Sequence, residues 1–152
     1  MKHHFLLDEN VLHHAVKGVD QNDNQDSTCA ELVLRIASNC HRVVVNQFLY
    51  ERYRSQIQVL MNVKSGILQP LYLLNQLILN SLKFVWQYEN LPSLPSGCFI
   101  PTEDVDVVRS ALISHPIFVT SDEDLRKAIN DCEALHLRAI HPTEALILAR
   151  DS

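Results

Sequence analysis

Short apolar runs alternate along this chain with longer stretches in which apolar side chains recur every three or four residues. The short runs predict strands at residues 3–7, 42–45, 98–100, 116–120 and 137–140. The helical spacing predicts helices over residues 27–40, 46–60, 71–86, 101–112 and 121–132, and a last one from Pro142 onward. Because strands that alternate with helices build parallel sheets covered by helices, we expect a three-layer α/β/α protein. Its central parallel sheet should have about five strands.

Size and composition agree with a single domain spanning residues 1–152. Hydrophobic residues make up 47% of the chain and charged residues 20%, with only three Gly and six Pro, which excludes disordered and low-complexity proteins. The most apolar region, residues 67–86, carries too many polar side chains to span a membrane. The helix predicted over residues 71–86 is apolar around most of its circumference, so its outer face is expected to form a homodimer interface or to pack within the monomer.

The N-terminus and the cysteines both predict a cytoplasmic protein. The first apolar stretch ends at Leu7 and is followed at once by acids, unlike the long apolar core of a signal peptide. The four cysteines form no CxxC pair, and three of them fall on apolar helical stripes. We therefore expect all four to be reduced core residues; they are Cys29, Cys40, Cys98 and Cys132.

Acidic side chains follow several of the predicted strands. Asp8 and Asp122 come just after strands, whereas Glu51 and Asp104 fall near the start of the helix after one. In parallel α/β sheets the carboxyl ends of the strands meet at one edge, where ligands bind. The sequence therefore predicts that four carboxylates converge at this edge.

Converging carboxylates need a counter-charge, because each pair at 4 Å repels by about 4 kcal/mol at an effective dielectric near 20. A set of Asp and Glu oxygens favours hard divalent cations, so the expected cofactor is Mg²⁺ or Mn²⁺. Such ions also bind phosphates and promote phosphodiester hydrolysis by water. The formal net charge of −5 does not exclude a nucleic-acid partner, provided that bound cations or a local basic strip are present.

The order and setting of these acids resemble the PIN domain, a family of metal-dependent nucleases that includes the VapC-type ribonuclease toxins. FLLDENVLHHA is similar to the family's opening strand, with Asp8 at the first acid and Asn10 at a small polar position. Glu9 stands where the family usually has a small or hydroxyl residue. NQFLYERY places Glu51 at the second acid.

The second half of the chain continues the resemblance. DVDVVRSAL is similar to the family's third motif and selects Asp104 rather than Asp106. IFVTSDEDL matches the fourth motif, with Thr120 and Asp122 in its T-x-D pattern and Asp124 as a fifth acid. The tail LRAIHPTEAL looks like the family's closing strand and helix. The likeness thus covers nearly the whole chain.

The resemblance implies an endoribonuclease in which water attacks and no side chain acts as nucleophile. Its catalytic residues are expected to be Asp8, Glu51, Asp104 and Asp122, which together with Asp124 hold the metal. RNA is expected to contact Asn10, Thr120, Arg52 and Arg109, the arginines through phosphates. If the protein is the toxin of a toxin–antitoxin pair, an antitoxin protein is a further expected partner.

Three other interpretations of the same residues stay open. Each acid could simply cap a helix or interact with its dipole. The chain could be a catalytically inactive PIN-like module that binds RNA or a protein. A phosphoryl-accepting receiver domain ranks third, because Asn46 and His141 occupy the neighbourhoods where that fold needs an acceptor Asp and a Lys.

Overall fold

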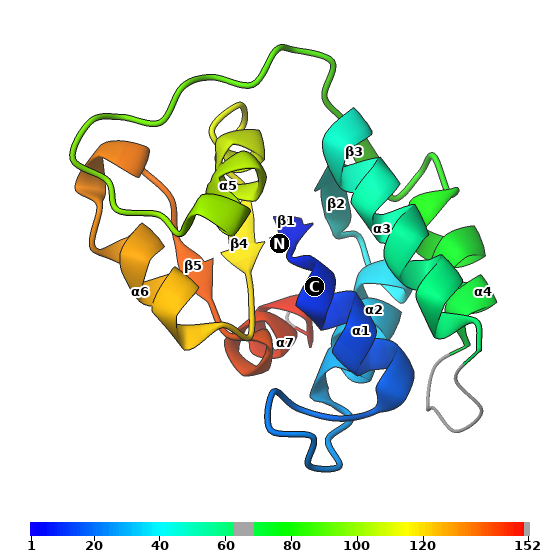
Figure 1. Ribbon diagram of the computed structural model, residues 1–152. Helices are drawn as coiled ribbons and strands as arrows, with labels where there is room; N and C mark the ends of the chain where they lie inside the picture. The colour runs from blue at the N-terminus through cyan, green and yellow to red at the C-terminus, as the bar shows by residue number, and fades with distance from the viewer. Residues whose placement is uncertain (63–68, 151–152) are drawn as a thin grey trace.

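The computed structural model describes residues 1–62 and 69–150, apart from the side chains of Leu71, Leu74 and Ile78. Five parallel strands form one sheet in the order β3-β2-β1-β4-β5, so that the first strand lies at its centre (Figure 1). The strands are β1 (His4–Leu7), β2 (Arg42–Val45), β3 (Phe84–Trp86), β4 (Ile117–Val119) and β5 (Ala139–Ile140). Helices flank the sheet, and the predicted three-layer α/β/α class is confirmed.

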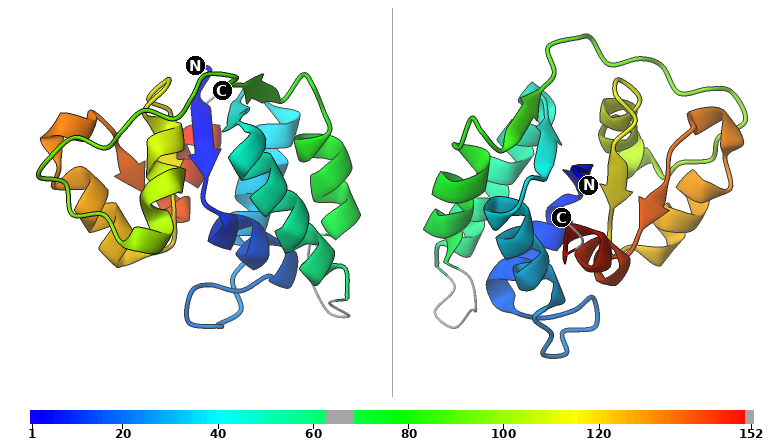
Figure 2. Two further views of the ribbon diagram at one scale, coloured as in Figure 1. Left: turned by 45° about the horizontal axis from the view of Figure 1, so that its top comes forward. Right: turned by 180° about the vertical axis from the view of Figure 1, so that it is seen from behind.

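The helices pack on both faces of the sheet. They are α1 (Glu9–Lys17), α2 (Thr28–Ser38), α3 (Gln47–Leu60), α4 (Pro70–Leu73), α5 (Val105–Ala111), α6 (Glu123–Asn130) and α7 (Pro142–Arg150). Short 3₁₀ turns at Thr102–Asp104 and Glu133–Leu135 complete the set, together with a π-helical turn at Leu74–Ile78. Helices α2 and α7 pack against each other on one face, while α5 and α6 lie on the other (Figures 1 and 2).

The core lies where the central strands meet the helices. Phe5 and Leu6 of β1 and Phe118 of β4 are fully buried, as is expected for strands covered on both faces. Tyr53 of α3 is buried beside them and donates a hydrogen bond from its hydroxyl to the backbone carbonyl of Leu7. This contact fixes α3 against the end of β1, directly below the predicted acidic edge.

The helix predicted over residues 71–86 is wrong in its second half. Helix α4 and the π-helical turn end at Ile78, and Phe84–Trp86 pairs with β2 as the edge strand β3. A stretch that is apolar on nearly all sides has no clear period, so periodicity does not distinguish a helix from a buried strand there. The strand predicted at residues 98–100 is also wrong, because these residues lie in the connection between β3 and α5.

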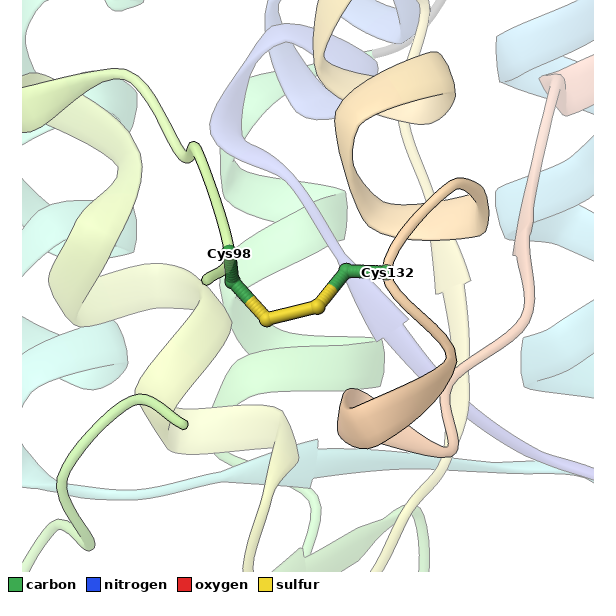
Figure 3. Close-up of a disulfide and its surroundings, with 2 residues drawn as sticks. All are labelled: Cys98 and Cys132. Carbon is green, nitrogen blue, oxygen red and sulfur yellow. A yellow bond between two sulfur atoms is a disulfide. The ribbon is translucent and has the colours of Figure 1, made fainter. Parts of the chain in front are cut away.

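The prediction that all four cysteines are reduced is wrong for two of them. Cys98, in the connection before α5, and Cys132, just after α6, form a disulfide with a Cα–Cα separation of 5.6 Å (Figure 3). Cys29 is buried and free, as expected, whereas Cys40 is free but exposed. The disulfide joins segments separated by 34 positions, a pairing that spacing alone cannot reveal.

Across residues 1–62 and 69–150, no helix is both long and apolar enough to cross a lipid bilayer.

Candidate active site

Asp8 lies at the carboxyl end of the central strand and is the most buried acid of the candidate site, with 6% of its surface exposed. Its side chain caps α1, since Oδ1 accepts a hydrogen bond from the backbone N–H of Glu9 at 2.8 Å. Oδ2 accepts hydrogen bonds from the Thr120 hydroxyl at 2.8 Å and from Asn10 Nδ2 at 3.3 Å. Burial and, to a smaller extent, the charge of Glu9 raise the pKa of this carboxyl, while the hydrogen bonds from Thr120 and the Glu9 backbone and the charge of Arg52 act in the opposite direction.

Thr120 links Asp8 to the next acid along the edge. Its Oγ1 accepts a hydrogen bond from the backbone N–H of Asp122 at 3.1 Å and lies 3.2 Å from the donor Asn10 Nδ2. Asp122 in turn caps α6, because Oδ1 accepts from the backbone N–H of Leu125 at 3.1 Å. The T-x-D pattern therefore joins the ends of β1 and β4 in one hydrogen-bonded unit.

Asp104 approaches the same unit from the 3₁₀ turn that precedes α5. Its pKa is raised to about 6, first by burial and then by the negative charges of Asp8, Glu103 and Asp122. Arg52 has the opposite effect on this carboxyl. Asp104 therefore lies close enough to Asp8 and Asp122 for their charges to act on it, although the three come from distant parts of the sequence.

Glu51 does not join these three acids. Its side chain is exposed and accepts a hydrogen bond from Gln47 Nε2 at 2.9 Å within α3. Asp124 is likewise exposed on the first turn of α6. Neither Glu51 nor Asp124 is among the main charges that shift the pKa of Asp8 or Asp104, although Glu51 lines one hollow together with Glu9 and Arg52.

Arg52 is the residue of α3 that faces the acids. Its guanidinium forms an ion pair with Glu9 at 3.0 Å, and its charge lowers the pKa of both Asp8 and Asp104. Arg109 has a different position. It donates hydrogen bonds to the backbone carbonyls of Leu91 and Pro92, at 3.0 and 2.8 Å, and thereby holds the connection that leads to α5.

Behind the acids, a further pair of side chains was not anticipated from the sequence. The Ser121 hydroxyl lies 3.2 Å from Nδ1 of the buried His14, and the Ser121 backbone N–H donates to Asn10 Oδ1 at 3.4 Å. The only sequence signal was that Ser121 lies between Thr120 and Asp122. The only sequence signal for Glu9, the ion-pair partner of Arg52, was that an acid stands where the PIN family usually has a small or hydroxyl residue.

The three aspartates provide the oxygen ligands that a hard divalent ion prefers, but the arrangement of their side chains fits such an ion only in part. Asp8, Asp104 and Asp122 offer carboxylate oxygens, and the raised pKa of Asp104 reflects its burial and the negative charges beside it, both of which a cation would offset. Yet within residues 1–62 and 69–150, no three His, Cys, Asp or Glu side chains are grouped tightly enough to ligate one ion. A metal that uses all three aspartates would require their side chains to move closer together.

Comparisons with known proteins bear on the fold. The chain matches a solved structure of a PilT N-terminus domain protein from the hyperthermophilic archaeon Sulfolobus solfataricus P2, with a TM-score of 0.51 and 11% sequence identity. The match covers 98% of this chain and 95% of the other. The fold is that of a PIN domain. No protein-family model and no curated protein matches the sequence.

Proposed function

We propose that this protein is a metal-dependent endoribonuclease whose reactive groups are Asp8, Asp104 and Asp122. The observation that carries the proposal is the raised pKa of Asp104, about 6, which results first from its burial and then from the negative charges of Asp8, Glu103 and Asp122. Folded proteins rarely keep such a cluster unless a cation or a proton relieves it. The PIN fold supports the proposal, because the three acids lie where its nuclease members are expected to carry theirs.

Each residue of the cluster has a role in this proposal. Asp8, Asp104 and Asp122 would hold Mg²⁺ or Mn²⁺, whose chemistry is to activate water and to stabilise the leaving oxygen. Thr120 and Asn10 orient the Asp8 carboxylate through their hydrogen bonds to Oδ2. Arg52 can exchange its contact with Glu9 for a phosphate of the RNA, since both partners are anionic oxygens. Arg109 positions the connection before α5 rather than the substrate.

The test compares two acids at the start of α5. Cleavage of an unstructured RNA should require Mg²⁺ or Mn²⁺, should stop in EDTA, and should fall by at least about a hundredfold in Asp104→Asn. Asp106→Asn is the matched control, because Asp106 is exposed and pairs with Arg109 at 3.2 Å instead of facing the cluster. Its activity should stay within about threefold of the wild type. Cleavage that persists in EDTA would refute the proposal.

A second candidate function is supported by the Arg52–Glu9 pair. Because Arg52 brings a fixed positive charge to the acids, the site is partly balanced without a metal, as in a catalytically inactive module that binds RNA or a protein partner. The two candidates differ in metal affinity. Millimolar Mn²⁺ should raise the melting temperature of a metal enzyme by mass action, and this rise should disappear in Asp104→Asn. An inactive module should show no such rise. The antitoxin partner and the homodimer stay predictions.

A further inference from the structure

We propose that Phe48, Trp86 and Tyr88 form a stacking site for unpaired nucleobases beside the acid cluster. The inference deepens the proposed function, on which it partly rests, by naming a binding site for the RNA strand next to the scissile bond. The three side chains come from the start of α3, from β3 and from the connection just after β3 (Figure 1).

The aromatic side chains surround a hollow at the edge of the sheet. This hollow has a volume of about 440 Å³ and is lined by Phe48, Trp86, Tyr88 and by polar neighbours that include Gln47, Gln87 and Asn90. The Trp86 and Tyr88 rings are 6.0 Å apart and inclined at 71°, and Tyr88 is 83% exposed. Large aromatic surfaces left in water at one place mark a binding surface, because burying them is favourable.

The polar lining suits bases better than an apolar protein segment. Gln87 is 93% buried, and its Oε1 is the one buried side-chain acceptor or donor of the described residues without a hydrogen-bond partner. Because protein already covers the Gln87 side chain, the polar side chains that a ligand meets in the hollow are the exposed Gln47, Glu89 and Asn90, which can form hydrogen bonds with base edges. The apolar face of a partner helix would instead cover the exposed Gln47 and Asn90 without pairing them, which is costly.

Cations lie beside the aromatic rings. The guanidinium of Arg52 is 5.3 Å from the centre of the Phe48 ring, and that of Arg54 is 5.7 Å from the centre of the Tyr50 ring. Tyr50 in turn packs edge-on against Trp86 at 5.7 Å. Aromatic faces interleaved with arginines are the combination with which proteins hold single-stranded nucleic acid, since bases stack on the rings and phosphates pair with the guanidinium groups.

Phe48 connects this hollow to the acid cluster. It also lines a neighbouring hollow of about 310 Å³ that contains Arg52 and Glu9, and Arg52 acts electrostatically on Asp8 and Asp104. Because β3 is two strands away from β1, the aromatic site lies on the order of 10 Å from Asp8 along the same edge of the sheet. One strand of RNA could therefore occupy both sites at once.

The test uses Trp86 as its own reporter, because the chain has a single Trp. A short oligouridylate is titrated into Asp104→Asn protein in EDTA, so that binding is read from Trp86 fluorescence while cleavage is suppressed. An abasic oligonucleotide with the same number of phosphates serves as the control ligand. We expect the oligouridylate to quench Trp86 and to bind about tenfold more tightly than the abasic strand.

Substitutions at two exposed aromatic residues then distinguish binding in the hollow from general effects on the protein surface. Tyr88→Ala should weaken oligouridylate binding by roughly tenfold, and Tyr88→Phe should restore it, because the ring face rather than the hydroxyl does the stacking. Phe99→Ala is the matched control, since Phe99 is 88% exposed but does not line the hollow. It should leave the affinity unchanged.

Equal affinity for the oligouridylate and the abasic strand would overturn the inference, because binding would then depend on phosphates alone. Trp86 fluorescence that changes with protein concentration, together with a dimer mass in sedimentation, would also overturn it and assign this face to a second copy of the chain. Base-dependent binding by wild-type protein that cleaves no RNA with either metal would support the stacking site while refuting the proposed nuclease function.

Discussion

The two halves of the candidate site are built differently. Around the ends of β1 and β4, Asp8, Asn10 and Thr120 are held by hydrogen bonds to one another and to backbone groups, and both Asp8 and Thr120 are buried. Around the ends of β2 and β3, Gln47 and Tyr88 are exposed, and charged and aromatic groups contact one another at the surface. The first, which we call the closed half, fixes the position of reactive groups, whereas the second, the open half, offers a surface to a flexible ligand.

The largest expected effect contrasts an acid from each half. Asp8→Asn should lower kcat/KM for RNA cleavage by at least about a hundredfold, because it removes a charge from the cluster. Asn is a good helix cap, so α1 should still begin at the same place. Glu51→Gln should cost less than about tenfold, since Glu51 interacts with Gln47 outside the cluster.

Steady-state kinetics at saturating Mn²⁺ provide the measurement, and urea unfolding checks that both variants fold. An equal loss of activity in the two variants would place Glu51 in the catalytic machinery and would remove the distinction between the halves.

A smaller effect concerns the free energy of unfolding. Thr120→Val keeps the shape of the side chain but removes the hydrogen bonds to Asp8 Oδ2 and from the Asp122 backbone N–H. It should destabilise the protein by about 2 kcal/mol, because a buried carboxylate and a backbone donor lose a partner. Gln47→Ala, in the open half, should change stability by less than about 0.5 kcal/mol. Urea midpoints that fall equally in both variants would contradict this account.

The sequence predicted the closed half well because its geometry is local. Asp8 follows β1 directly, Asp122 follows β4 after Thr120 and Ser121, and both cap the next helix, so strand ends and cap residues were enough to place them. Asp104 was also placed at the right edge, because the parallel α/β pattern brings the ends of the strands together. The placement of these acids at one edge thus follows from a pattern that can be read in short segments, whereas the strand order β3-β2-β1-β4-β5 was not predicted.

The same reasoning could not predict the open half, and the causes are physical. Neighbouring residues on a helix point about 100° apart, so a small error in helix phase exchanges Glu51 for Arg52 at the site. The strand β3 was hidden in a stretch whose apolar residues fit a helix equally well. The Cys98–Cys132 pairing depends on how a long connection crosses the molecule, which no local spacing encodes.

The next effect tests the cost of the negative charge on Asp104, which burial and the neighbouring acids together raise. The folded-state pKa of Asp104 is about 6, above the 3.8 of a free side chain. The folded protein therefore binds a proton more tightly than the unfolded chain, and stability is lost as the pH rises through this range. In EDTA at about pH 8, Asp104→Asn should stabilise the protein by about 1 kcal/mol, a value reduced from the full shift because the group is partly exposed.

At about pH 3 the difference between Asp104→Asn and the wild type should nearly vanish, since the Asp104 carboxyl is then mostly neutral in both the folded and the unfolded state. Urea unfolding at the two pH values provides the measurement. A stabilisation that is the same at both pH values would mean that packing, rather than charge repulsion, governs this position.

The smallest expected effect is a response to mild acid, which should be seen in the closed half and not in the open half. His14, which contacts Ser121 behind the closed half, has a pKa lowered mainly by burial, with a smaller contribution from the charge of His13. Its neutral form is favoured in the folded state, so its contribution to stability is present above the unfolded value of 6.5 and decreases as the pH falls below it. His14→Gln keeps a hydrogen-bonding group but cannot take up a proton. Between about pH 7 and pH 5.5 this variant should therefore lose less stability than the wild type, by a fraction of a kcal/mol.

Residues 46–54 and 84–91 of the open half contain no histidine. Base-dependent quenching of Trp86 should therefore change little over the same pH range, and a parallel loss of both signals would show that the two halves are coupled.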